Sequence, residues 1–345
     1  MAPQSVTYLI ANTPPRPLLS IILVKYTKKM KQHRAKKGYS MIQKMRVSAF
    51  LVILQCITLG ARTWQREDLL KYDVDFDRSM SFDQKDKFYK RRQKSKKNKV
   101  TSFCRELYQK NNLLTVVPHE NTLIPKIVHL IWVGPKTPPP VFNRCVESIK
   151  KHMPDWELKI WTDADLPKLK LVNQQYYDEE TNYGAKADIL RYEILYQFGG
   201  TYLDVDFVVT QPLDILNHAY EFYTCMMPSR TKASVITNGI IASVPGHPIL
   251  KHSIDTIKKH RKRKDILRRV GPQHFESSFY EMAQQLPDSR IVAFPRTFFF
   301  PLEIQEAAGE TIEVPAETFG IHYWTASWSD KLSTKRRNHG AHGNV

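Results

Sequence analysis

Short apolar runs alternate with amphipathic stretches along the second half of the chain. Residues 124–134 (IPKIVHLIWVG) predict a short buried strand that ends at Gly134, before the prolines of residues 138–140. Residues 157–161 predict a second strand. The apolar positions between them predict a helix carrying Phe142, Val146, Ile149 and Met153. Such strand–helix–strand units build parallel sheets that bind ligands beyond the carboxyl ends of their strands, so we expect an α/β fold with a mostly parallel central sheet.

The stretch from residue 184 to residue 209 gives the clearest pattern. Its first half predicts a helix with a buried apolar stripe, formed by Ala187, Leu190, Ile194 and Phe198. Asp188 and Arg191 lie one turn apart at the edge of this stripe, so their side chains can reach one site. Gly199 and Gly200 then predict the end of the helix, because glycine adopts the left-handed conformation that satisfies the last carbonyl groups.

A strand with two spaced carboxylates follows the glycines. Period-two alternation predicts four core-facing residues, Leu203, Val205, Phe207 and Val209. Tyr202, Asp204 and Asp206 then share the opposite face. Neighbouring carboxylates repel each other unless a cation lies between them, and oxygen ligands suit a hard ion such as Mn²⁺ or Mg²⁺. Such an ion keeps open positions for phosphate oxygens, which indicates a nucleotide diphosphate ligand; the alternative is a solvated polar strand face.

Two other features do not indicate a site. Residues 162–165 contain a second Asp-x-Asp, which we interpret as a turn and helix N-cap because no apolar alternation follows it. The four cysteines have no close spacing, so they predict neither a zinc site nor a disulfide scaffold: Cys56, Cys104, Cys145 and Cys225.

The net charge of +18 comes almost entirely from two short regions. Residues 25–46 hold nine Lys or Arg and no acid, and residues 85–100 hold nine Lys or Arg and one Asp. The rest of the chain is nearly neutral, so the charge says little about a catalytic region. We expect residues 62–120 to be a basic, solvated stem. Nucleic-acid binding is the alternative, but no recognisable DNA- or RNA-binding motif accompanies the charge.

Residues 47–61 form an uncharged, mostly apolar segment between the two basic regions. The segment is shorter than the ~20 residues of a full bilayer span. It has the length of a signal-peptide core, which would start at Met45 and end near Ala61, or of a short signal-anchor read from Met1. A third reading is a buried helix of the folded domain. The basic residues before it predict a cytoplasmic N-terminus, with the remainder in a lumen or outside the cell.

The central stretch resembles glycosyltransferase family 32, which includes the Golgi initiating α-1,6-mannosyltransferases of fungi, and the Asp-x-Asp region of the large clostridial glucosylating toxins. The matching positions are Ala187-Asp-Ile-Leu-Arg-Tyr192 and Gly199-Gly-Thr-Tyr-Leu-Asp-Val-Asp206. A thinner resemblance extends from about Pro125 to Trp328. It implies a GT-A-type, Rossmann-like nucleotide-sugar-binding domain at residues 121–330. This domain would follow a basic region (1–46), the hydrophobic segment (47–61) and the stem (62–120), and precede a disordered tail (331–345).

The resemblance also implies roles for single residues. Asp206 would ligate the ion directly, Asp204 would hold the ribose and reach the ion, and His322 would be the third ligand. A structural histidine beside core tryptophans is the alternative for His322. Asp188 and Arg191 would grip hydroxyl groups of the donor sugar.

The remaining nucleotide-sugar contacts are implied in the same way. Trp132 would stack on the nucleobase, unless it is simply a core residue. Asn238 would contact the sugar and Tyr202 would join the donor site, while Ser327 and Trp328 would cover the diphosphate.

These inferences together predict a metal-dependent retaining glycosyltransferase that moves a hexose from GDP-mannose or a UDP-sugar to a glycan, lipid or protein. A non-catalytic sugar-binding protein on the same fold and a basic nucleic-acid-binding protein are the alternatives; we expect no nucleic acid as partner. The hydrophobic segment predicts membrane contact and a single-pass type II protein with a Golgi-like lumenal catalytic domain. If the signal is cleaved, the protein would be secreted or reside in a cell envelope.

Overall fold

Strand β1 (Ile127–Ile131), helix α7 (Val141–His152) and strand β2 (Glu157–Trp161) form the first strand–helix–strand unit, as the apolar pattern predicts. β1 and β2 pair in parallel over their full length. This computed structural model describes residues 64–85, 88–227, 235–302 and 313–325. The hydrophobic segment, the region before it, Ser327, Trp328 and the C-terminal tail lie outside the described residues.

A six-stranded sheet forms the centre of the fold, in the order β2-β1-β3-β6-β5-β7. Its other strands are β3 (Gly200–Leu203), β5 (Phe222–Met227), β6 (Val235–Ser243) and β7 (Ile291–Phe294). β1 is parallel to β2 and β3, and β5 is parallel to β7, whereas β6 runs antiparallel to both β3 and β5. The expected α/β class with a mostly parallel sheet is confirmed, with one reversed strand inside the sheet.

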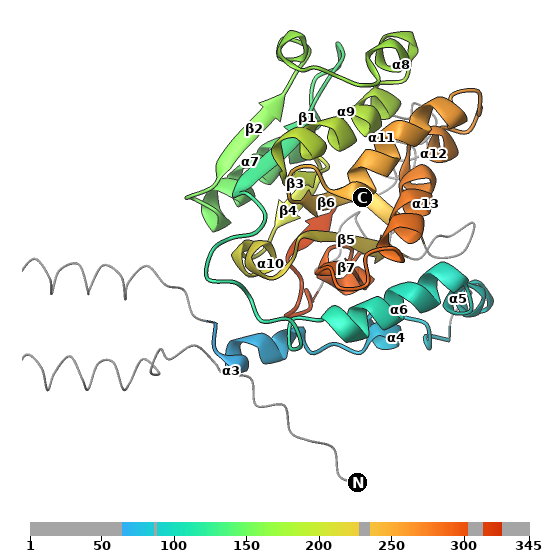
Figure 1. Cartoon of the computed structure of the whole chain (residues 1–345). Helices are drawn as coiled ribbons and strands as arrows, with labels where there is room; N and C mark the ends of the chain where they lie inside the picture. The colour runs from blue at the N-terminus through green and yellow to red at the C-terminus, as the bar shows by residue number, and fades with distance from the viewer. Residues whose placement is uncertain (1–63, 86–87, 228–234, 303–312, 326–345) are drawn as a thin grey trace, which may run out of the picture. The chain divides into compact units, whose positions relative to one another are not determined.

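Helix α9 (Tyr183–Phe198) packs on the sheet beside α11 (Pro248–His260), and α11 packs against α13 (Pro272–Ala283). Figure 1 shows these three helices grouped on one side of the sheet. Asn182 caps the start of α9, where its side chain accepts a hydrogen bond from the Ala185 N–H. Gly199, with φ 64°, caps the end of the helix. The predicted glycine stop is confirmed. The short elements between are η2 (Leu166–Lys168), α8 (Gln174–Glu179), α10 (Asp214–Ala219), α12 (Ile266–Arg269) and η3 (Arg296–Phe298).

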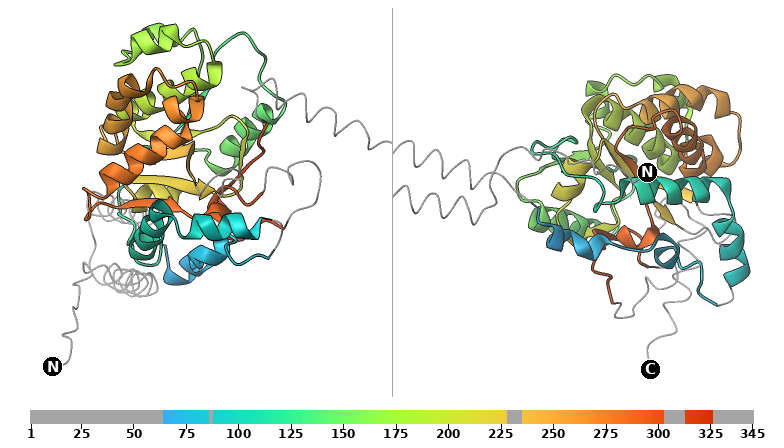
Figure 2. Two further views of the ribbon diagram at one scale, coloured as in Figure 1. Left: turned by 90° about the vertical axis from the view of Figure 1, so that its right-hand side faces the viewer. Right: turned by 60° about the horizontal axis from the view of Figure 1, so that its bottom comes forward.

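Residues 64–120 differ from the expected stem, because their described part packs onto the domain. They form α3 (Arg66–Leu69), η1 (Leu70–Tyr72), α4 (Phe76–Ser79), α5 (Tyr89–Lys96) and α6 (Lys99–Asn111). Figures 1 and 2 show α4 and α6 side by side under the β7 edge of the sheet. Tyr72 stacks on Phe319 with 5.0 Å between ring centroids, and buried Tyr108 packs against Phe294. Val100, Phe103, Cys104, Leu107 and Tyr108 recur at helical spacing along α6 and form its buried face, whereas the dense lysines that suggested a stem lie in and around α5.

The strand that carries the two carboxylates is also different from the prediction. β3 ends at Leu203, residues 204–206 form a turn, and β4 (Phe207–Val209) leaves the main sheet. β4 pairs with β8 (Gly320–His322) in a separate two-stranded antiparallel sheet, with Phe207 opposite His322. Asp204 and Asp206 therefore lie at the junction of two sheets rather than along one strand face.

The described residues include no helix with the length and apolar character needed to cross a membrane.

Candidate functional site

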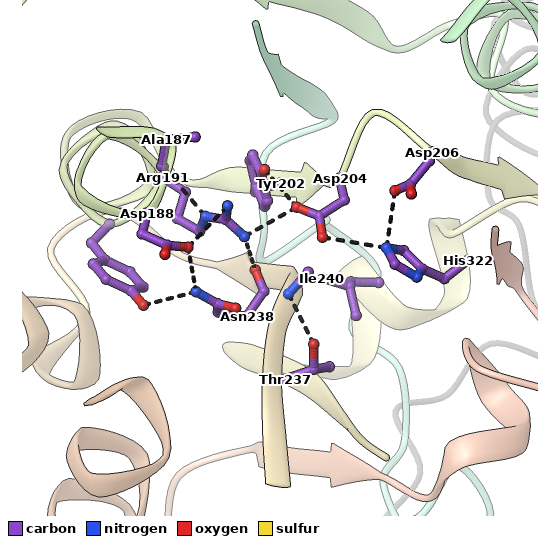
Figure 3. Close-up of polar contacts among 12 residues, drawn as sticks. Ala187, Asp188, Arg191, Tyr202, Asp204, Asp206, Thr237, Asn238, Ile240 and His322 are labelled. Carbon is purple, nitrogen blue, oxygen red and sulfur yellow. Dashed lines mark hydrogen bonds and ion pairs between the residues drawn. The ribbon is translucent and has the colours of Figure 1, made fainter. Parts of the chain in front are cut away.

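Arg191 is the centre of a buried polar network at the carboxyl end of β3 (Figure 3). Its Nη1 donates hydrogen bonds to Asp204 Oδ1 at 3.1 Å and to the Asn238 carbonyl at 2.6 Å. Its Nη2 lies 3.1 Å from Asp188 Oδ1, and the guanidinium lies over the Tyr202 ring, 4.3 Å from the centroid. The predicted group of Asp188, Arg191 and Asp204 is therefore assembled, with Asn238 and Tyr202 attached to it. All five come from α9, β3, β6 and the turn after β3.

Asp204, Asp206 and His322 form a second group beside this network (Figure 3). His322 Nε2 lies 2.9 Å from Asp206 Oδ1 and 3.4 Å from Asp204 Oδ2. One ligand atom from each residue fits within 4.8 Å of the other two. The pairing of β4 with β8 brings His322 here, across more than a hundred residues of sequence.

The protein holds one oxygen of each carboxylate and leaves the other directed at this centre. Asp204 Oδ1 accepts from the Tyr202 hydroxyl at 2.8 Å and from Arg191, which leaves Oδ2 facing His322. Asp206 Oδ2 accepts hydrogen bonds from the Thr325 N–H at 2.7 Å and from the Thr325 hydroxyl at 2.8 Å. This leaves Asp206 Oδ1 facing His322. Two carboxylate oxygens and an imidazole nitrogen suit Mn²⁺ or Mg²⁺, so the donor set fits the expected divalent ion.

Gly239 leaves room for the close approach of the Asp204 carboxylate. The Gly239 carbonyl accepts a hydrogen bond from the Asp204 N–H at 2.8 Å. A Cβ at Gly239 would lie 2.7 Å from Asp204 Oδ2, well inside van der Waals contact. Glycine in a strand interior is expected where another group comes this near.

The two carboxylates favour a positive charge on His322. Burial raises the pKa of Asp206, but the facing His322 outweighs burial and holds that pKa well below its usual range. Burial lowers the pKa of His322, but Asp206 and Asp204 outweigh it and raise the pKa to about 9. A metal ion bound here would replace the imidazolium proton, since a ligating histidine must be neutral.

Asp188 is in a different electrostatic environment. Burial raises the pKa of its carboxyl to about 7, against the opposing charge of Arg191. Its Oδ1 also accepts a hydrogen bond from Asn238 Nδ2 at 2.7 Å. Asp188 and Asn238 are therefore fixed to each other next to Arg191.

The remaining predicted residues are less closely connected. Trp132 directly follows β1, as expected, but its indole N–H donates to the Lys136 carbonyl at 2.6 Å, and none of its hydrogen bonds within the described chain reaches the carboxylates. The predicted turn at residues 162–165 is present, with Asp165 Oδ2 accepting from the Thr162 N–H and hydroxyl.

Two contacting residues were not predicted, Thr325 and Tyr192. Thr325 lies in the histidine- and tryptophan-rich segment from residue 320, and Tyr192 lies in the block matching the family. Local sequence pattern indicates neither residue, because each makes its hydrogen bonds to residues far away in sequence.

Part of this chain is similar to a described protein family. Residues 139–223 match the family described as "Glycosyltransferase sugar-binding region containing DXD motif". Asp188, Arg191, Asp204 and Asp206 lie inside the match. Asn238 and His322 lie outside it, and the fold brings them to the site.

Curated proteins similar to this chain include named glycosyltransferases. Inositol phosphoceramide mannosyltransferase 3 of Schizosaccharomyces pombe is 28% identical over 183 residues, covering 50% of this chain and 49% of the relative. Inositol phosphoceramide mannosyltransferase 1 of the same organism is 30% identical over 159 residues, covering 43% and 47%. An uncharacterized glycosyltransferase, L373, of Acanthamoeba polyphaga mimivirus is 27% identical over 191 residues, covering 53% and 75%. The chain spans about half the length of the two yeast relatives.

Among solved structures, the PaToxG glycosyltransferase is 20% identical, with a TM-score of 0.43 over 54% of this chain and 78% of that one. The family match agrees with the resemblance to the Asp-x-Asp glycosyltransferases, and the observed sheet confirms the expected α/β class. Residues 139–223 of this chain are therefore similar to a glycosyltransferase sugar-binding region, and Asp204-Val205-Asp206 has the form of its DXD motif.

Proposed function

We propose that the protein is a metal-dependent retaining glycosyltransferase, which moves a hexose from a nucleotide diphosphate sugar to an acceptor. The observation that carries this proposal is the convergence of Asp204 Oδ2, Asp206 Oδ1 and His322 Nε2. The other oxygen of each carboxylate is held by the protein, so the three ligand atoms are preorganised for an ion.

Asp204, Asp206 and His322 would hold Mn²⁺ or Mg²⁺, which stabilises negative charge on the leaving diphosphate. Arg191 keeps Asp204 in place through its hydrogen bond to Oδ1. Asp188 and Asn238 are available to fix hydroxyl groups of the donor sugar, so that its anomeric carbon is oriented toward the acceptor. Retention of the anomeric configuration rests on the family resemblance, and the anomer of the product tests it: an inverted linkage would refute this part.

The names of the relatives guide the choice of substrates. The S. pombe relatives are named as inositol phosphoceramide mannosyltransferases, so GDP-mannose is the first donor to test and a phosphoinositol lipid the first acceptor. UDP-sugars are the other donors to test, and glycans and proteins are the other acceptors. The basic residues before residues 47–61 support a membrane-anchored protein with a lumenal catalytic domain, which protease protection of the full chain in microsomes would test.

The decisive experiment measures donor hydrolysis and transfer by the full chain across GDP- and UDP-sugars, with Mn²⁺, Mg²⁺ or chelator. Asp206→Asn should lose chelator-sensitive turnover. Asp165→Asn is the matched control, because Asp165 belongs to the second Asp-x-Asp but contacts Thr162 in the turn and Lys168 in η2. Sugar binding without turnover would favour the non-catalytic alternative, and neither binding nor turnover with any donor would refute the proposal.

A further inference from the structure

We propose that Tyr192 is a positioning residue, whose hydroxyl fixes the Asn238 carboxamide so that its oxygen accepts a hydrogen bond from one hydroxyl of the donor sugar. The inference rests on the proposed function and assigns a role to a residue outside the carboxylate and histidine group.

The direction of each hydrogen bond follows from the partners of Tyr192. The Tyr192 hydroxyl donates its single proton to the Val270 carbonyl at 2.8 Å. A backbone carbonyl can only accept, so the hydroxyl oxygen must act as the acceptor toward Asn238 Nδ2, which lies 3.1 Å away.

The same reasoning fixes the Asn238 side chain. Its NH₂ group has two hydrogens, one directed at Tyr192 and one at Asp188 Oδ1, 2.7 Å away. Turning the amide over would place its oxygen against two acceptors, which is unfavourable. The carboxamide oxygen therefore points away from both, and within the described residues it accepts no hydrogen bond, although Asn238 is only 5% exposed.

An acceptor held in this way selects a ligand that donates a hydrogen bond. The Asn238 backbone is also fixed, since its carbonyl accepts from Arg191, so the oxygen has little freedom to move. A sugar hydroxyl supplies the missing donor, and an analogue that lacks this hydroxyl leaves the oxygen unpaired.

Packing makes Tyr192 a rigid support. It is fully buried, and its ring stacks on Phe275 with 5.8 Å between centroids and an interplanar angle of 12°. Val270 precedes Gly271, where a Cβ would lie 3.3 Å from Asp188 Oδ2. The Tyr192 hydroxyl thus connects the segment between α12 and α13 to Asn238, which in turn donates to Asp188.

The test compares deoxy analogues of the donor that the wild-type protein uses, beginning with GDP-mannose. In the wild type, removal of one particular hydroxyl should lower kcat/KM about tenfold more than removal of the others, the factor of one neutral hydrogen bond. Tyr192→Phe keeps the ring and removes both hydrogen bonds. We expect it to lose discrimination at that same hydroxyl, and to retain its affinity for Mn²⁺.

Tyr220→Phe is the matched control, because Tyr220 is equally buried and its hydroxyl donates to the Asn111 carbonyl away from the site. It should keep the wild-type discrimination. If Tyr192→Phe does not fold, Asn238→Asp provides the same test. The carboxylate oxygen that replaces the Asn238 NH₂ group cannot donate to Tyr192 or Asp188, so this variant should also lose discrimination at that hydroxyl.

Unchanged discrimination in a folded, active Tyr192→Phe or Asn238→Asp protein would overturn this inference and leave the proposed function intact. A wild-type protein that neither binds nor turns over any donor would overturn both.

Discussion

The substitution Gly239→Ala tests the geometry of the carboxylate site with the smallest change to the protein. The new Cβ would lie 2.7 Å from Asp204 Oδ2, so the carboxylate must move by several tenths of an ångström. It cannot rotate freely, because Oδ1 is held by the Tyr202 hydroxyl and by Arg191. Relieving the contact therefore breaks one of these bonds or turns Oδ2 away from His322.

The magnitude follows from those hydrogen bonds. A charged hydrogen bond contributes about 1.5–3 kcal/mol, so we expect affinity for Mn²⁺ in the presence of donor to fall about 10- to 100-fold. Global stability should change less, because overpacking costs about 1–3 kcal/mol while replacing glycine in a strand returns roughly 0.5–1 kcal/mol. Titration calorimetry with Mn²⁺ and thermal unfolding separate the two effects.

Gly246→Ala is the control for a loss of stability that does not disturb the carboxylate site. A Cβ there would meet no atom within 4 Å, but φ is +72°, a conformation that alanine adopts at a cost of about 1–2 kcal/mol. This variant should lose stability and keep its affinity for Mn²⁺. Unchanged ion and donor affinity in Gly239→Ala would show that Asp204 Oδ2 is not a ligand and would refute the proposed site.

Three further predictions concern other parts of the protein. Thr325→Val should weaken Mn²⁺ binding about tenfold because Asp206 loses a hydroxyl donor, whereas Thr325→Ser should bind normally; equal affinities would exclude this role. Burial raises the pKa of Glu276 from 4.5 to about 7, so the folded state binds its proton more tightly and stability falls as pH rises between these values. Glu276→Gln should therefore raise the free energy of unfolding by about 1–3 kcal/mol at pH 8 and little at pH 4.5, a difference that urea unfolding at both pH values would detect. Removal of residues 1–120 should abolish cooperative unfolding measured by circular dichroism, since each lost aromatic core residue costs about 3–5 kcal/mol; removal of residues 1–62 alone should not.

The sequence predicts the parts of this fold that depend on local pattern. The strand at residues 157–161, the helix before it and the stop at Gly199 follow from apolar spacing and glycine chemistry, and the structure has all three. Helix spacing predicts that Asp188 and Arg191 reach one site, and the family resemblance implies that Asp204 joins them; the structure brings all three together.

Features that depend on tertiary contacts could not be predicted from pattern alone. Alternation continues through residues 203–209, so the sequence gives no sign of the turn at residues 204–206 that sends β4 to a second sheet. The basic run in and around α5 indicates a solvated stem, although the apolar spacing of α6 is regular; that α6 packs on β7 depends on tertiary contacts. Thr325 and Tyr192 act through single hydroxyl groups, whose partners lie on other elements.

The pairing of β4 with β8 has a consequence for how the chain responds to an ion. His322 reaches Asp206 only while β8 is docked with Phe207 opposite His322. Binding and docking are then one linked equilibrium, so an ion that prefers the docked state must slow exchange of the β8 amide hydrogens, and chelation must speed it. Ion binding would therefore stabilise the docked state of β8, and removal of the ion would destabilise it.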